Sequence, residues 1–142
     1  MLAIGLFFFG HWASSVFFQT FFQHRYAAHR MFTMSKTWER IFYKLTYITQ
    51  GSSFLVPRGY AILHRAHHAY SDTEKDPHTP HLYTNVFSMM WQTKQSYSAL
   101  VRNEVEPEAR FNGHVPVWPA LDRFGDSTAS RVGWIAAYSA FY

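Results

Sequence analysis

The chain has 142 residues, no cysteine, a formal charge of +4, 20% aromatic and 15% charged residues. This length suits one domain or part of one, and the basic residues are scattered, which argues against a nucleic-acid partner. Without cysteine there is no disulfide, thiolate metal site or thiol nucleophile, so any metal must be held by imidazole, carboxylate or water.

The first predicted element is the uncharged apolar segment 2–22, LAIGLFFFGHWASSVFFQTFF. Its length matches the roughly 20 residues that cross a bilayer core, so we expect a transmembrane helix. A secretory signal would have a positive start, a shorter apolar core and a small-residue cleavage point, none of which is clear here. A buried helix of a soluble protein is the other alternative. Basic residues begin at Arg25, and by the positive-inside tendency they place this flank in the cytoplasm.

Residues 36–63 are apolar at helical spacing, but Gly51 and Pro57 interrupt the pattern. The repeat consists of Trp38, Ile41, Phe42, Leu45 and Ile48. A helix lying in the membrane interface fits this segment better than a second span. If the chain does not cross the membrane here, His29 and His64 lie on the same side of it.

The rest of the chain is expected to continue the helical pattern. Residues 64–71 predict helix, and 72–80 predict a loop that contains two prolines. Residues 82–100 predict a second interfacial helix, 101–131 a polar connector on the solvent side, and 133–142 the start of a further span. The expected fold class is therefore an all-α, membrane-embedded protein with one full transmembrane helix.

Two histidine patterns stand out, His24 with His29, and His64 with His67 and His68. On a helix, positions i, i+3 and i+4 share one face, so the trio can converge on one point or on a pair of points. Positions i and i+5 are about 140° apart on an ideal α-helix. The first pair must therefore bind different metals or lie where the helix unwinds.

Each pattern also has a simpler interpretation. The first pair could be interfacial residues beside Arg25 and Arg30, and the trio could be a solvated, protonatable face. The pair alone arises easily by chance among nine histidines, whereas the trio does so rarely. Both patterns together, near the cytoplasmic end of an apolar segment, favour a metal site.

The segments HRYAAH (24–29) and HRAHHAYSDTEKDPHTP (64–80) resemble the first two histidine boxes of the integral-membrane fatty acid desaturases. The acyl-CoA desaturase branch is the nearest match, because its second box runs on into a similar Asp-Pro-His segment. TQGSS (49–53) is similar to the helix between the boxes in that branch. At the level of motifs the resemblance covers about residues 17–83.

The resemblance implies an O2-dependent oxidoreductase that introduces a C=C bond into a fatty acyl chain, as acyl-CoA or acyl-lipid, at a diiron centre. The implied iron ligands are His24, His29, His64, His67 and His68. Desaturation attacks C–H bonds that are neither acidic nor polarised, so a cofactor must carry this step. Imidazole also suits zinc and copper, so the choice of two iron ions rests on the resemblance.

Electrons would come from a separate protein such as a ferredoxin, a rubredoxin or a b-type cytochrome. Asp72 and Asp76 are close enough in sequence to orient a ligand histidine. Gln50 is an amide in an apolar stretch, which needs a partner or a task, and we expect it near the substrate tunnel. His78 is expected to be structural. Three further histidines match no box: His11, His81 and His114.

One departure from the family pattern is serious. The family has a third cluster of His-x2-His-His type, and after His81 this chain has only His114. Five imidazoles cannot fill two iron sites, so we expect residues 1–142 to be the N-terminal part of a single desaturase domain, inactive alone. The domain parts would be a transmembrane helix at 2–22, a histidine-box region with its interfacial helix at 24–81, and the segments from 101 onward. The alternatives are a membrane diiron hydroxylase of alkanes, sterols or carotenoids, and a non-catalytic histidine-rich protein that binds metal.

Overall fold

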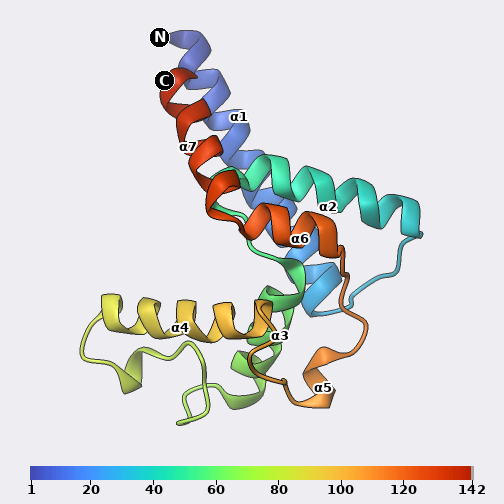
Figure 1. The fold of residues 1–142 in the computed structure, drawn as a ribbon, viewed down its shortest axis with the longest axis vertical. Coiled ribbons are helices and arrows are strands. Elements are labelled where there is room, and N and C mark those ends of the chain that lie inside the picture. Colours follow the sequence, from blue (N-terminus) through green and yellow to red (C-terminus); the bar gives the residue numbers. More distant parts are fainter. Residues whose placement is uncertain (142) are drawn as a thin grey trace.

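The computed structural model describes residues 1–141; Tyr142, the last residue of the span start predicted at 133–142, lies outside the described residues. The described residues form helices and loops with no strand, which confirms the predicted all-α class (Figure 1). The elements are α1 (Leu2–Phe18), η1 (Gln19–Ala28), α2 (Lys36–Gln50), η2 (Gly51–Ser53), α3 (Pro57–Tyr70), η3 (Pro80–Leu82), α4 (Val86–Val101), α5 (Ala109–Asn112), α6 (Pro119–Asp126) and α7 (Thr128–Phe141).

The first two elements form one continuous helix, Leu2–Ala28. Within residues 1–141 it is the one helix long and apolar enough to cross a membrane, and it extends six residues beyond the predicted 2–22. No residue of α1 is buried, and its large side chains, such as Phe8, Phe9 and Trp12, are exposed. This is the surface expected of a helix surrounded by lipid. Helix α7 lies beside α1, so the two ends of the described chain are close together (Figure 1).

The last ten residues of the long helix, Gln19–Ala28, are wound as a π-helix. There the backbone N–H of His29 donates to the carbonyl of His24 at 2.9 Å, an i to i−5 bond. Long π-helices are rare, and single π-turns occur mainly at functional sites. The helix ends where Arg30 takes a positive φ of 56°. One of the two alternatives given for His24 and His29 was a place where the α-helix unwinds. The π-helix is wound more widely than an α-helix, so residues five apart lie on the same side of it.

Helix α2 crosses α1 (Figure 1), and its large apolar side chains are exposed. Its first turn is capped by Ser35, whose hydroxyl accepts the N–H of Trp38 at 3.4 Å. The residues buried on the inner face are Glu39, Tyr43, Thr46 and Gln50. The exposed apolar residues are Trp38, Ile41, Leu45 and Ile48. In water this would be an inverted helix, but it is the arrangement expected of a helix at a membrane surface.

The main core lies where η1, α2, the segment before α3, and α4 meet. Its buried members are Phe22, Tyr43, Phe54, Val56 and Tyr97. Two buried glutamines close a ring of hydrogen bonds beside it. Gln23 donates to the Leu55 carbonyl at 2.6 Å, Gln50 donates to Gln23 Oε1 at 2.7 Å, and the Leu55 N–H donates to Gln50 Oε1 at 3.2 Å. Because these buried amides are paired, they tie η1 to the end of α2 at small energetic cost.

The segment 101–131, predicted as a polar connector on the solvent side, has helices of its own and contacts the core; its place relative to solvent stays a prediction. It contains two short helices, α5 and α6, and Phe111 is buried against α3. Asp122 accepts hydrogen bonds from the Tyr43 hydroxyl and from the Trp118 N–H. Two contributions explain this local structure. Pro119 starts α6 at a position that proline favours, and a buried tyrosine hydroxyl needs an acceptor.

Candidate metal centre

Four histidines from two helices converge on one point. His24 and His29 come from η1 and its C-cap, and His64 and His68 come from α3. One ring nitrogen of each lies within 4.8 Å of the others. The Nε2 atoms of His24 and His29 are 3.1 Å apart, those of His29 and His64 are 3.0 Å apart, and those of His64 and His68 are 3.0 Å apart. We call these four residues the four-histidine cluster.

Local geometry explains why these four rings meet. The π-winding brings the first pair to one side of its helix, and the i, i+4 spacing on α3 places the second pair one turn apart; within each pair the rings meet edge to face. The two helices approach closely because Ala27, Ala28 and Ala61, all small and buried, meet at the contact. Tyr60 covers one face of the His64 ring, because the two rings are stacked with their centroids 5.5 Å apart.

The four-histidine cluster fits a shared metal ion. Two nitrogens bound to one ion at about 2.1 Å lie roughly 3.0 Å apart at a right angle and roughly 3.4 Å apart at a tetrahedral angle. Three of the six separations, at 3.0–3.1 Å, correspond to the lower end of this range, and all six are within 4.8 Å. All four donors are imidazoles, a set that suits iron, zinc or copper and not magnesium or calcium.

The surroundings favour the neutral form of two histidines of the cluster, His29 and His64. Burial, followed by repulsion from His24 and His68, lowers the pKa of His64 to about 4. Burial also lowers the pKa of His29, and the neighbouring His24 adds to the effect. These two imidazoles are therefore neutral at pH 7, and their lone pairs are available to a metal.

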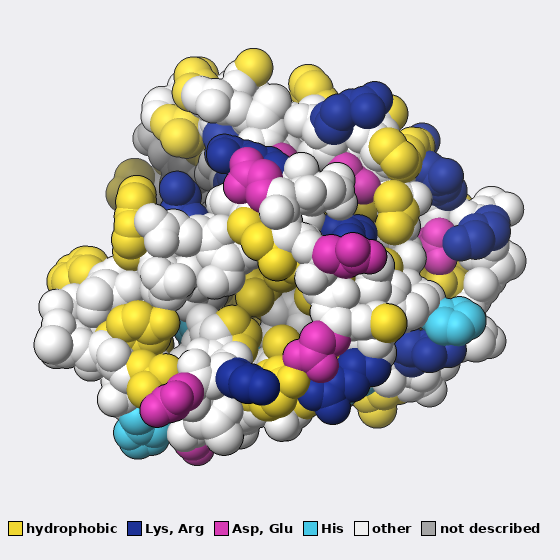
Figure 2. All heavy atoms as spheres, turned by 60° about the horizontal axis from the view of Figure 1, so that its bottom comes forward, with side chains coloured by type: hydrophobic (Ala, Val, Ile, Leu, Met, Phe, Trp, Pro, Cys, Tyr) yellow, Lys and Arg dark blue, Asp and Glu magenta, His cyan; other side chains and the backbone are white. Residues whose placement is uncertain are grey.

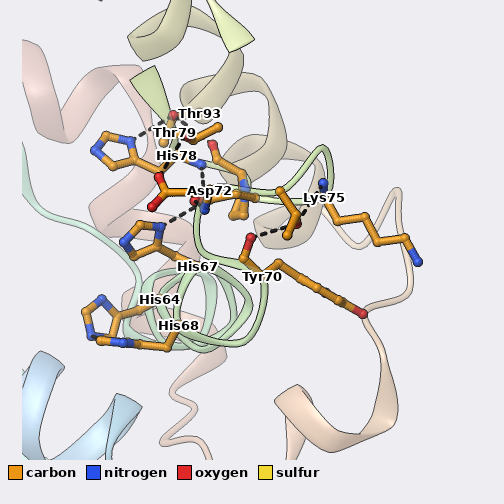
Figure 3. A network of polar contacts seen from close by, with 12 residues as sticks. His64, His67, His68, Tyr70, Asp72, Lys75, His78, Thr79 and Thr93 are labelled. Atoms are coloured by element: carbon orange, nitrogen blue, oxygen red, sulfur yellow. Dashed lines mark hydrogen bonds and ion pairs between the residues drawn. The ribbon is translucent and has the colours of Figure 1, made fainter. Parts of the chain in front are cut away.

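His67 lies outside the cluster and faces a different group. Its Nδ1 is 2.8 Å from Asp76 Oδ1, and the Asp76 carboxylate also accepts the N–H groups of His78 at 2.9 Å and Asp72 at 3.0 Å. Figure 3 shows His67 turned toward the loop that carries Asp72 and His78, while His64 and His68 lie together on the other side. Burial alone would raise the pKa of Asp76, but the hydrogen bonds from His67 and the two N–H groups hold that pKa below its ordinary value.

The other predicted site residues are placed as follows. Asp76 contacts a histidine of the second pattern, whereas the exposed Asp72 lies 3.4 Å from His81 Nε2. Gln50 is enclosed in the glutamine ring described above. His78 Nδ1 lies 3.1 Å from the Thr93 hydroxyl. His11 lies 3.1 Å from the Tyr138 hydroxyl, away from the cluster, and His114 lies in a loop with a φ of 55°.

Sequence reasoning missed two neighbours of the cluster, Tyr60 and Arg65. The Tyr60 ring lies against His64, one turn earlier on α3, and the i, i+4 spacing was the available signal. The Arg65 guanidinium donates to backbone carbonyls of distant segments. Nothing in the spacing pattern signals that contact.

No family model matches the chain, and no solved structure matches it. Over 61 residues it is 38% identical to a Delta-9 desaturase-like 5 protein of Arabidopsis thaliana, covering 43% of this chain and 19% of that protein. Over 126 residues it is 30% identical to a hex-5-enoyl-[acyl-carrier protein] acetylenase of Moorena producens (strain JHB), covering 87% of this chain and 36% of that protein. The aligned regions thus span about a fifth and about a third of these relatives. The similarities support a desaturase-related family.

Proposed function

We propose that this chain is part of a membrane-bound, O2-dependent fatty acyl desaturase with a histidine-ligated diiron centre. The observation that carries the proposal is the four-histidine cluster. In it, one ring nitrogen from each of His24, His29, His64 and His68 lies within 4.8 Å of the others, although the four residues come from two separate helices. Two of its members, His24 and His29, lie at the end of the helix that is able to cross a membrane. The names of the two relatives, a desaturase-like protein and an acetylenase, indicate the chemical class.

The five histidines of this chain would be shared unequally between the two iron ions. One iron would be held by His24, His29, His64 and His68. His67 would bind the second iron through Nε2, because its Nδ1 is engaged by Asp76. Such a carboxylate fixes the ring and its tautomer for metal binding. The remaining ligands of the second iron would come from outside the five histidines.

Bound iron would supply the activation of O2 that removes hydrogen from an unactivated methylene, which no side chain can do. The protein would hold the metals and keep water away from the reaction. The buried residues Ala27, Ala28 and Ala61 close one side of the four-histidine cluster, and Tyr60 covers His64. Neutral His29 and His64 would bind the ion without first losing a proton at pH 7.

The exposed surfaces support a proposed arrangement relative to the membrane. Helix α1 would span the bilayer, the apolar side of α2 would lie in its interface, and the histidines would face the cytoplasm with Arg25 and Arg30. The acyl chain of acyl-CoA or an acyl-lipid would reach the metals from the membrane side. Figure 2, which brings the lower end of Figure 1 forward, shows basic and acidic side chains dispersed among hydrophobic ones. An electron-transfer protein (ferredoxin, rubredoxin or b-type cytochrome) would dock on the cytoplasmic side.

The test is expression of the complete gene product in cells, followed by mass spectrometry of the cellular acyl chains with and without O2. A desaturase yields chains that are lighter by two hydrogen atoms, only with O2, and His64→Ala abolishes them. Chains heavier by one oxygen atom would identify a hydroxylase instead. Purified protein that contains zinc without iron and gives neither product would identify a non-catalytic metal-binding protein.

A further inference from the structure

The guanidinium of Arg65 is surrounded by backbone carbonyls. It donates from Nε to the Ala28 carbonyl at 2.8 Å and from one Nη to the Ala27 carbonyl at 2.8 Å. Its other Nη donates to the carbonyls of Phe111 at 2.6 Å and Gly113 at 2.8 Å. Four hydrogen bonds from one side chain, all to main-chain atoms of other elements, make it the most extensively bonded side chain near the four-histidine cluster.

The first two acceptors close the end of η1. The last carbonyls of a helix have no partner within it, and a cation there also interacts favourably with the helix dipole. Ala28 directly precedes His29, whose Nε2 lies 3.0 Å from that of His64. Arg65, which follows His64 on α3, is therefore hydrogen-bonded to Ala28, which precedes His29. It joins the backbone that carries His29 to the helix that carries His64.

The other two acceptors, the carbonyls of Phe111 and Gly113, connect Arg65 to a segment that is distant in the chain. Phe111 and Gly113 are 46 and 48 residues from Arg65 in the chain. Phe111 is buried with Ile62 of α3, so the carbonyls are held in place by packing. Val115, a few residues on, packs against the alanine contact between η1 and α3. Three segments, η1, α3 and the end of α5, thus meet at one guanidinium.

We propose that Arg65 is a positioning residue that sets the separation of His29 from His64, and hence the metal affinity of the four-histidine cluster. The role in metal binding rests on the proposed function; the backbone contact does not. Arginine suits this task because its planar fork presents five donors in fixed directions, whereas a lysine ammonium presents three from a single point. Lysine at this position keeps the charge and cannot reach all four carbonyls.

Arg131 of α7 provides a matched control. It also donates to two backbone carbonyls, of Ser52 at 2.8 Å and Phe54 at 3.3 Å, and it pairs with Asp126. Its contacts stabilise the segment between α2 and α3 and touch no histidine. Substitution of Arg131 tests what the loss of a comparable carbonyl clamp does to the chain in general.

The experiment uses the purified 142-residue chain in detergent micelles, with the variants Arg65→Lys, Arg65→Gln and Arg131→Lys. Co²⁺ binding is followed by calorimetry and visible absorption, and hydrogen exchange of the His29 and Arg30 amides is followed without metal. Both Arg65 variants should bind Co²⁺ about 10- to 100-fold more weakly, the range typical of lost support around a metal ligand, with an altered Co²⁺ spectrum. Their His29 and Arg30 amides should exchange faster. Arg131→Lys should leave affinity and spectrum unchanged.

Wild-type Co²⁺ affinity and spectrum in a folded Arg65→Lys chain would overturn the proposal, as would an equal loss of affinity in Arg131→Lys. If Arg65→Gln does not fold, Arg65→Lys alone decides. A wild-type chain that binds no Co²⁺ would refute the metal site of the proposed function. The exchange rates at His29 and Arg30 would then still decide whether Arg65 positions this backbone.

Discussion

Alanine at His68 and alanine at His67 should have very different effects on metal binding, although the two residues are adjacent. His68 Nε2 lies 3.0 Å from His64 Nε2 within the four-histidine cluster. His67 is outside the cluster, with Nδ1 bound by Asp76 and its ring centroid 5.8 Å from that of His68. We therefore expect His68→Ala to weaken binding of a single metal ion, and His67→Ala to leave it nearly intact.

The size of the effect follows from the number of donors. Structural sites with four protein ligands bind zinc with about 10–16 kcal/mol in total, so one ligand of four accounts for roughly 3 kcal/mol. His68→Ala should therefore raise Kd about 100- to 1,000-fold. His67→Ala removes no donor from the cluster and should change Kd by less than about threefold.

The assay is a competition titration of the purified chain in micelles with Zn²⁺ and a chromophoric chelator, with circular dichroism to verify the helix content of each variant. His81→Ala serves as the control, because this histidine is exposed and bonded to Asp72. If the two variants weaken binding equally, or if His68→Ala has no effect, the separation of the histidines into two groups is wrong.

Two further substitutions, with Gly133→Ala as a control for the first, test the packing of the helices. Gly51→Ala should lower the free energy of unfolding by about 2–4 kcal/mol, because Gly51 has a φ of 53° and a Cβ would lie 2.0 Å from the Tyr138 hydroxyl. Gly133→Ala on α7, where a Cβ meets open space, should leave stability equal or slightly higher; an equal loss in both would contradict the argument. Tyr97→Phe should cost about 1–3 kcal/mol in urea unfolding, since the Tyr97 hydroxyl accepts the buried Val56 N–H at 2.7 Å; unchanged stability would show that the contact is dispensable.

Much of the candidate site could be predicted from sequence because its determinants are local. An uncharged run of about 20 residues predicts α1 whatever surrounds it. The i, i+4 spacing of His64 and His68 predicts their proximity on any α-helix. The prediction that His29 and His64 lie on one side of the membrane required only that no span intervenes, and the structure places their rings in contact.

Other features of the site could not be predicted, because they depend on contacts between residues that the local sequence pattern does not indicate. The trio on α3 could converge on one point or on two, and the choice is made by Asp76, which holds His67 away from its neighbours. The π-winding of η1 likewise needs support beyond its own sequence, and Arg65 supplies part of it at the last carbonyls. Tyr43 and Asp122 are 79 residues apart, so their hydrogen bond could not be foreseen from either segment.

The depth of the proposed metal centre relative to the membrane would follow from the helix that carries His24 and His29. Helix α1 has 17 residues and would cover about 26 Å, so one further turn reaches the end of a bilayer core about 30 Å thick. That turn is the start of η1, where burial begins: no residue of α1 is buried, whereas Phe22 and Gln23 are completely so. His24 follows immediately. If α1 spans the bilayer and His24 binds the metal as proposed, the winding of this one helix would set the distance from bilayer to metal, and an acyl chain leaving the lipid would have only a short path to the four-histidine cluster.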